Sequence, residues 1–347
     1  MKEPDSAPTM ALLCLHIARR SAQVLPRTAH PALESQIRYH TREALAKGKP
    51  GQGAPSKPQR LSPVEAVQYC QRLTRRQDYD GYLASLFFPA GVVRSAVWAI
   101  RAFNIEVASI RDTVSNESIG QMKILFWKQL LKDITAGKPS PDQPIAMLLG
   151  QALPQLRLNP HWLSKLVTAR EKNLTQSVYY TMDDVEAYAE STASALLYLQ
   201  LECLGIKDVQ ADHVASHLGK AVGITTLLRA TPANAAKRWV YLPQDSLARH
   251  KVSQEDLFRQ GRAPGLDDAV FEIATRAHDH VLTAQSHLRK LDPSIPITPF
   301  LSSIPSIHYL RRLEQTNFDI FNPKLRHREW TMPFTLWRAQ SKRDLGV

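Results

Sequence analysis

The sequence has little cysteine, little glycine and no long apolar run. Its 347 residues include only 3 cysteines and 14 glycines. Cys14, Cys70 and Cys203 are widely spaced and form no C-x-x-C or Cys/His ligand pattern, which argues against a disulfide scaffold or a structural zinc site. Uncharged stretches such as residues 191–201 are shorter than the roughly 20 residues that cross a bilayer. No transmembrane helix is therefore expected.

Acidic residues are also scarce relative to basic ones. The chain holds 44 Lys and Arg against 32 Asp and Glu, a formal net charge of +12. Half of the excess lies in the first 60 residues, and no basic stripe interleaved with aromatic residues follows, so no nucleic-acid partner is expected. The mitochondrial matrix or an anionic membrane surface explains the charge better.

The N-terminal segment has the composition of a targeting sequence. Residues 10–33 contain no acid, and Arg19, Arg20 and Arg27 stand in an apolar and Ser/Thr/Ala background. Residues 1–40 are therefore predicted to be a mitochondrial transit peptide. The alternative is an N-terminal segment of similar composition that has no targeting function. Residues 41–61 are rich in Gly, Pro, Lys and Gln and are predicted to be a flexible linker.

From Ser62 onward the sequence predicts consecutive helices. Ser62-Pro63-Val64-Glu65 is typical of a helix start, with an N-cap, a first-turn proline and an early acid. Apolar residues between Val97 and Val114 recur at helical spacing. Further helices are expected over residues 119–134, 162–176, 184–204, 212–228, 255–259 and 270–291. No strand alternation appears, so residues 62–347 are predicted to form a single all-α domain.

One predicted helix resembles a metal-binding helix that has lost its ligands. Residues 102–112, A-F-N-I-E-V-A-S-I-R-D, are similar to the first metal helix of squalene and phytoene synthases, roughly A-F-C-R-x-x-D-D-x-x-D. In that family the acidic side chains hold Mg²⁺ against a substrate diphosphate. Here Ala108 and Ser109 stand at two of the three acidic positions, and only Asp112 remains.

A second segment resembles the family's other metal helix and departs from it in the same way. Residues 219–234 correspond to roughly G-x-A-x-Q-x-x-N-x-x-R-D-x-x-E-D, and Gly219, Ala221 and Arg229 match. The positions of the expected Gln, Asn, Asp, Glu and Asp hold Gly223, Thr226, Ala230, Ala233 and Asn234. Residues 239–243, which include Tyr241, resemble the downstream G-R-x-Y-L-P element. Residues 82–89 followed by Arg94 resemble the family's entry motif.

These resemblances imply a retained scaffold without its metal site. Mg²⁺ prefers oxygen ligands and is usually held by carboxylates together with substrate phosphates. The family's fold implies an isoprenoid-synthase-like helical bundle around a central cavity, here with no catalytic residue, no metal and no cofactor. The vestigial cavity positions would be Arg94, Ala108, Ser109, Asp112, Arg229, Ala230, Ala233, Asn234 and Tyr241.

Other segments resemble one branch of the family, the mitochondrial complex I assembly factor 6 group. They include residues 170–174, 204–208, 211–221 and 228–232, and the last of these, L-R-A-T-P, already lacks the catalytic acid. The resemblance implies a non-catalytic assembly factor on the matrix side of the inner membrane, bound peripherally. Its partners would be complex I subunits or assembly intermediates.

Two alternatives stay open from the residues alone. A divergent prenyltransferase would hold its metal through Asp112 and Glu106, although positions six apart share a helix face poorly. A prenyl- or lipid-binding protein without turnover would keep a ligand in the residual cavity. Arg229 and Tyr241 fit either an anionic ligand or a buried hydrogen-bonded pair.

Histidines recur at helical spacing in two places. His213 and His217 stand four apart, and His278, His280 and His287 fall in another predicted helix. Neither set has an H-E-x-x-H pattern or a placed acid, so surface or interface histidines are expected rather than a metal site.

Overall fold

The computed structural model describes residues 61–114, 116–138, 140, 142–176 and 178–346. The transit peptide expected over residues 1–40 and all but the last residue of the expected linker lie outside this range. A compact unit spans Leu61–Val347. Helices, turns and loops make up its described residues, with no β-strand among them. The expected all-α fold is therefore confirmed.

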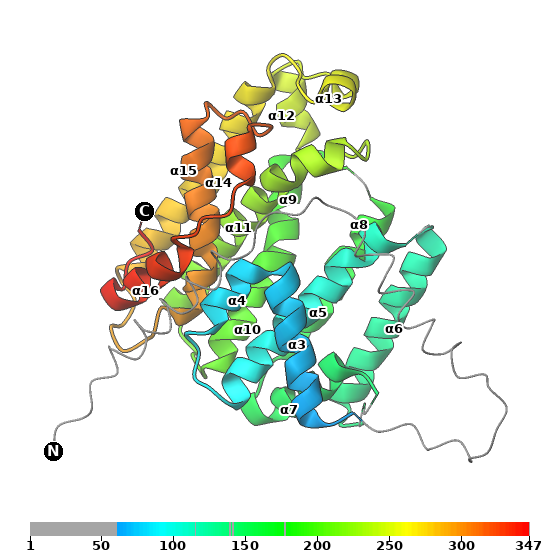
Figure 1. Ribbon diagram of the computed structural model, residues 1–347, viewed down its shortest axis with the longest axis vertical. Helices are drawn as coiled ribbons and strands as arrows, with labels where there is room; N and C mark the ends of the chain where they lie inside the picture. The colour runs from blue at the N-terminus through cyan, green and yellow to red at the C-terminus, as the bar shows by residue number, and fades with distance from the viewer. Residues whose placement is uncertain (1–60, 115, 139, 141, 177, 347) are drawn as a thin grey trace. The chain divides into compact units, whose positions relative to one another are not determined.

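The N-terminal half of the unit is built around one long helix. Helix α5 (Val92–Thr113) packs against the other helices of this half and against α10 (Ala195–Cys203), and supplies much of the core (Figure 1). Its Phe103 ring meets Trp127 edge-on at 5.1 Å between ring centroids. The surrounding helices are α3 (Pro63–Gln77), α4 (Tyr79–Ser85), α6 (Glu117–Thr135), α7 (Pro144–Leu156) and α8 (Pro160–Thr175).

The C-terminal half is organised by the pairing of α11 (Val209–Ala235) with α14 (Leu266–Leu288), which lie side by side over much of their length (Figure 1). Shorter elements complete this half. They are α9 (Met182–Ala189), the π-helix η1 (Glu190–Ser194), α12 (Gln244–Arg249), α13 (Gln254–Gln260), the 3₁₀-helix η2 (Thr298–Ser303), α15 (Ile304–Gln315), the 3₁₀-helix η3 (Pro323–Arg326) and α16 (Met332–Lys342).

Local sequence signals fix where the chain turns into helix. Ser62 caps α3 as expected, and the Glu65 carboxylate accepts a hydrogen bond from the Ser62 backbone N–H at 2.8 Å.

Within the described residues, no helix is both long and apolar enough to span a membrane.

Two glycines of α11 allow a close contact with the segment that runs from α9 into η1. A Cβ on Gly223 would lie 2.4 Å from the Ala189 Cβ, and one on Gly219 would lie 2.3 Å from the Ser194 Cα. Neither distance leaves room for a side chain. Gly223 stands where the resemblance led us to expect Gln, so the closeness of these helices depends on that substitution.

Candidate functional site

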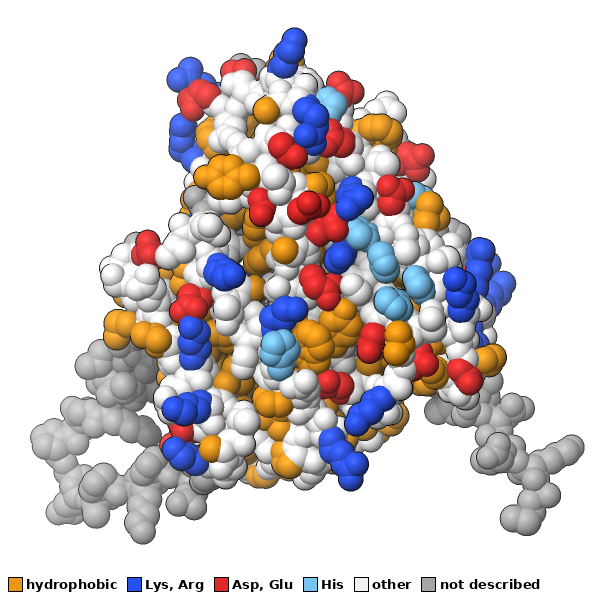
Figure 2. Space-filling model, turned by 180° about the vertical axis from the view of Figure 1, so that it is seen from behind, with side chains coloured by type: hydrophobic (Ala, Val, Ile, Leu, Met, Phe, Trp, Pro, Cys, Tyr) orange, Lys and Arg blue, Asp and Glu red, His pale blue; other side chains and the backbone are white. Residues whose placement is uncertain are grey.

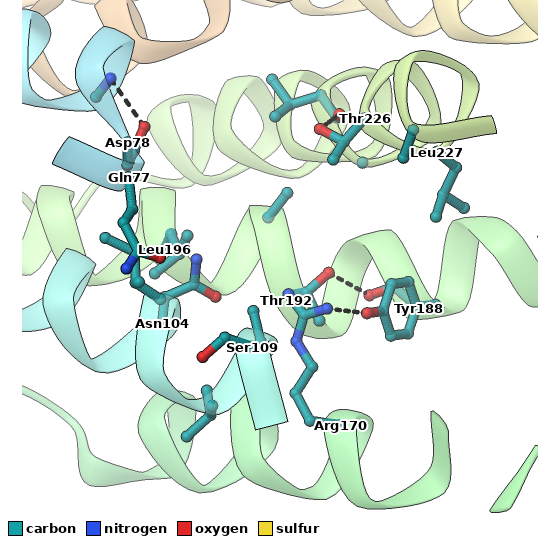
Figure 3. A pocket seen from close by; sticks show the side chains of 18 of the residues that line it. Gln77, Asp78, Asn104, Ser109, Arg170, Tyr188, Thr192, Leu196, Thr226 and Leu227 are labelled. Carbon is teal, nitrogen blue, oxygen red and sulfur yellow. Dashed lines mark hydrogen bonds between the residues drawn. The ribbon is translucent and has the colours of Figure 1, made fainter. Parts of the chain in front are cut away.

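A cavity of about 520 Å³, lined by both polar and apolar side chains, lies where α5, α8, α11 and the α9–α10 segment face one another (Figure 3). It brings together seven of the nine positions singled out from the sequence. They are Ala108, Ser109, Asp112, Arg229, Ala230, Asn234 and Tyr241. The positions on the two metal-like helices thus share one cavity, although even the two nearest in sequence, Asp112 and Arg229, are 117 residues apart (229 − 112).

The other two positions lie elsewhere. Arg94 donates two hydrogen bonds to the Phe88 carbonyl oxygen, at 2.6 and 3.0 Å, and so ties the start of α5 to the preceding loop. Ala233 is exposed on α11. Neither side chain lines the cavity in the described part of the chain.

Asp112, the carboxylate retained at the first metal-like helix, is paired with a cation from the protein itself. The Lys237 ammonium lies 2.7 Å from the Asp112 Oδ1 and 5.4 Å from the centre of the Trp239 ring. Both side chains of the pair are about half exposed. The contact links the end of α5 to the turn after α11, 125 residues later. Sequence reasoning missed Lys237 because only the tertiary fold brings it to Asp112.

Arg111 is the cation at the aromatic end of the cavity. Its guanidinium carbon lies 4.7 Å from the Trp239 ring centre and 5.1 Å from that of Tyr241. It also donates to the Asn173 side-chain oxygen at 2.6 Å, and the Asn173 amide donates to the Tyr179 hydroxyl at 3.1 Å. Burial raises the pKa of Tyr241 to about 12, so its hydroxyl stays protonated.

Arg229 and Tyr241 do not form the buried pair that the sequence left open. Arg229 is an exposed residue of α11, whereas Tyr241 is buried, and no hydrogen bond joins the two in the described chain. The hydrogen-bond alternative is therefore wrong, because Arg111 takes the place beside Tyr241.

A buried ion pair forms another part of the cavity wall. Arg101 is only 6% exposed and donates to Asp78 at 2.6 Å. Gly81 makes room for it, since a Cβ there would lie 2.0 Å from the Arg101 Nη1. The Arg101 Nε and the Asn104 Oδ1 are buried without a hydrogen-bond partner among the described residues. Such unpaired groups are uncommon in native interiors.

Arg170 of α8 and Tyr188 of α9 form a polar contact in the opposite part of the cavity wall from Arg101 and Asp78. Arg170 donates a hydrogen bond to the Tyr188 hydroxyl (Figure 3), and its guanidinium carbon lies 5.2 Å from the ring centre. The Thr192 hydroxyl of η1 donates to the Tyr188 carbonyl oxygen at 2.7 Å. Leu196 and Leu197 add apolar surface to this wall.

The carboxylates that line the cavity do not make a Mg²⁺ site. Asp112 is paired with Lys237, and Asp78 is paired with Arg101. The third, Asp80, has a pKa raised by burial, which favours its neutral form. Mg²⁺ needs several oxygen ligands in near-octahedral geometry, and here two of the three carboxylates already bind a cationic side chain. Among the described residues, no group of three or more His, Cys, Asp or Glu could hold a metal ion.

Glu106, the second ligand considered for a divergent enzyme, faces another helix. Its Oε1 accepts a hydrogen bond from the Tyr69 hydroxyl of α3 at 3.3 Å. It is absent from the described lining of the cavity that contains Asp112. The two carboxylates therefore do not converge.

Four of the histidines noted in the sequence meet across the α11–α14 contact. The Nδ1 atoms of His217 and His280 are 2.9 Å apart, and the rings of His213 and His287 stack at 5.0 Å between centroids. Figure 2 shows histidine side chains gathered on one face of the molecule. Burial lowers the pKa of His217 to about 4, and also lowers that of His280.

Comparison with known proteins identifies the family. Residues 74–338 match the family model for squalene/phytoene synthase. The chain belongs to the squalene/phytoene synthase family. Its resemblance to the assembly factor 6 branch is also confirmed, because proteins from mouse and human named "NADH dehydrogenase (ubiquinone) complex I, assembly factor 6" are 44% and 43% identical to it. Each alignment covers 78% of this chain and 80% of the relative.

The solved structures agree with this assignment at the level of the fold. A dehydrosqualene synthase crystallised with a ligand superposes with a TM-score of 0.69 at 17% identity, covering 81% of this chain and 97% of the other. The expected isoprenoid-synthase-like bundle around a cavity is therefore confirmed.

Proposed function

We propose that this protein is a non-catalytic assembly factor for mitochondrial respiratory complex I. It acts from the matrix side of the inner membrane, bound peripherally, through contacts with complex I subunits or assembly intermediates. The names of its mouse and human relatives support the assembly role. The basic, acid-free segment over residues 10–33 supports the mitochondrial address.

The observation that carries the non-catalytic part is the Lys237–Asp112 pair. Ionising an allylic diphosphate requires positive charge to neutralise the leaving group, which metal ions supply when carboxylates hold them. Asp112 instead meets an ammonium group, and Ala108, Ser109, Ala230 and Asn234 bring no charge to the same cavity. The protein is thus a pseudoenzyme that keeps the scaffold of its family.

A turnover assay tests this directly. The purified full chain, incubated with farnesyl diphosphate and millimolar Mg²⁺, should release no diphosphate above a no-protein control. Steady release that disappears in Asp112→Asn would overturn the proposal and restore the divergent prenyltransferase.

The assembly role has its own test in cells depleted of the endogenous protein. Re-expression of the chain should restore mature complex I on native gels, and Asp112→Asn should restore it equally well. Immunoprecipitation followed by identification of co-purifying subunits would name the partner. Failure of the unmodified chain to restore complex I would refute the assembly role whatever the turnover assay shows.

A second candidate function is supported by the unpaired groups in the cavity wall. The Arg101 Nε, Asn104 Oδ1 and Arg170 Nε are buried without partners in the described chain. A bound prenyl or lipid molecule with a polar head would satisfy such groups without any turnover. Native mass spectrometry of the protein from its source would detect that ligand, and only apo protein would argue against it.

A further inference from the structure

The solvent-facing side of α6 carries large apolar residues where a surface helix normally carries polar ones. The exposed fractions are 69% for Met122, 59% for Leu125, 53% for Phe126 and 40% for Ile119. Their spacing of three, four and seven residues places them on one face. We call these four residues the α6 stripe.

The stripe is not the edge of the core. The opposite face of α6 is the buried one, and it includes Ile124, Trp127 and Leu131. That face packs against α5, α7 and α8, while Figure 1 shows α6 at the outer margin of this half. The stripe residues are exposed and are not covered by another described element. Helix α6 therefore has two apolar faces, and only one of them packs against the rest of the protein.

Basic residues flank the stripe. At 100° per residue, Lys123 lies on one side of it and Lys132 on the other. Without Arg170, which lines the cavity, helices α6 and α8 together carry five Lys against three Asp and Glu. The surface around the stripe therefore has a positive net charge, which favours an anionic partner.

A groove of about 560 Å³ runs between α6 and α8, and its lining on α6 begins at Lys128, after the last residue of the stripe. Lys132 of α6 and the hydroxyl-bearing residues Ser164 and Thr168 line it, whereas the Thr135 hydroxyl in its wall already donates to the Leu131 carbonyl oxygen at 2.7 Å. Ammonium and hydroxyl groups are hydrogen-bond donors suited to phosphate oxygens. Lys132, a donor for phosphate, thus lies on the same helix as side chains suited to acyl chains.

We propose that the α6 stripe is the membrane-docking element of this protein and that its occupant is an anionic phospholipid bilayer. The inference rests on the peripheral membrane association in the proposed function and adds the element and the lipid chemistry. A convex apolar stripe flanked by lysines matches a helix lying in the headgroup region, with its apolar face some 5–10 Å into the interface. An acidic protein segment is the competing occupant that the test must separate from lipid.

Vesicle flotation of the full chain tests the binding. The protein should float with vesicles of phosphatidylcholine containing phosphatidylglycerol, and much less with phosphatidylcholine alone or at high salt. Met122→Ser/Leu125→Ser/Phe126→Ser should weaken binding about tenfold or more. Lys123→Gln/Lys132→Gln should weaken it roughly fivefold for each lysine removed. The matched control is Trp330→Ser/Phe334→Ser, which removes two other exposed rings and should bind like the parent.

A local probe distinguishes membrane contact by α6 from membrane contact by the N-terminal segment, which is also basic. In a Cys14→Ser background, an environment-sensitive dye is attached to Met122→Cys or, as a control, to Phe334→Cys. Burial raises the pKa of Cys70 and Cys203 to about 12, so the introduced thiol reacts first. Anionic vesicles should shift the emission of the dye at position 122 to the blue and leave that at position 334 unchanged.

Three results would overturn the inference. They are flotation unaffected by the stripe substitutions in a folded variant, a blue shift at position 334 instead of 122, and an absence of vesicle binding by the unmodified chain. Stripe-dependent capture of a complex I subunit without lipid binding would assign the surface to a protein instead. Because the vesicles contain no complex I component, a negative result leaves the assembly role standing, and that role is scored separately by complex I recovery in cells.

Discussion

The Lys237 ammonium lies 2.7 Å from the Asp112 carboxylate and joins the end of α5 to the turn that follows α11. In a metal-dependent enzyme of diphosphate substrates, metal ions held by carboxylates provide the positive charge. Here a side chain of the protein provides it. Asp112 therefore has a cationic partner within the described chain itself.

Restoring the carboxylates should create a metal-responsive protein. The variant Ala108→Asp/Ser109→Asp/Ala230→Asp/Asn234→Asp places four like charges around one cavity, so its melting temperature should fall in the absence of metal. Millimolar Mg²⁺ should recover part of the loss by binding the folded state. Thermal melting with and without Mg²⁺ provides the measurement.

The matched control for that restoration is Ala233→Glu, which adds a carboxylate on the same helix but outside the lining of the cavity. It should melt like the parent and ignore Mg²⁺. If the quadruple variant behaves in the same way, the four positions do not converge and the alignment with the metal helices is wrong.

Glycine-to-alanine substitutions should have opposite effects at two helical sites. Gly223→Ala places a Cβ 2.4 Å from the Ala189 Cβ and should destabilise the protein by about 1–3 kcal/mol. At Gly150 the nearest atom to an added Cβ is 3.6 Å away, in Ile134. Gly150→Ala should therefore stabilise by about 0.4–1 kcal/mol, because the unfolded chain loses freedom. Urea denaturation of both variants measures the two signs, and equal effects would contradict the close packing of α9 on α11.

Acid should destabilise the fold partly through His217. Its pKa is about 4 in the folded protein against an ordinary value of 6.5, because burial and the nearby His280, Lys220, His287 and His213 disfavour its charged form. Between these values the unfolded chain binds a proton that the folded protein excludes, so this contribution to stability is present above pH 6.5 and is lost as the pH falls toward 4.

The measurement is the melting temperature from pH 7.5 to 5. His217→Gln should flatten its acid decline, although Glu186 and Arg276, which contact His280, continue to influence the same region. His278→Gln, an exposed histidine on α14, serves as the control and should follow the parent. If the melting temperature of His217→Gln falls with pH as steeply as that of the parent, His217 does not contribute to the acid destabilisation.

The two ion pairs of the N-terminal half should differ strongly in their energetic effect. Arg101→Met leaves the Asp78 carboxylate without its ion-pair partner. Breaking a buried ion pair typically destabilises a protein by about 3–5 kcal/mol. We expect the lower end of that range here, because Asp78 is 30% exposed. Lys128→Met removes a pair with Glu171 in which both side chains are more than a third exposed, so it should cost under about 1 kcal/mol. Denaturant midpoints compare them, and equal losses would contradict the assigned burial.

The sequence by itself determined the class of fold and the identity of the altered positions. Helical spacing of apolar residues and the Ser62 cap are local signals, so they predicted helices that the structure contains. The absence of acids at Ala108, Ser109 and Ala230 is likewise visible without coordinates, since a missing side chain needs no geometry to be noticed.

Only the tertiary structure decided which cations lie beside the cavity residues and which surface of α6 is exposed. Lys237 pairs with Asp112 across 125 residues, and Arg111 rather than Arg229 lies beside Tyr241, because both contacts depend on how α5 and the end of α11 pack. The same holds for the α6 stripe. Helical periodicity predicts that a helix exists and has an apolar face, but a helix with apolar residues on two faces reveals which one is buried only when its neighbours are in place.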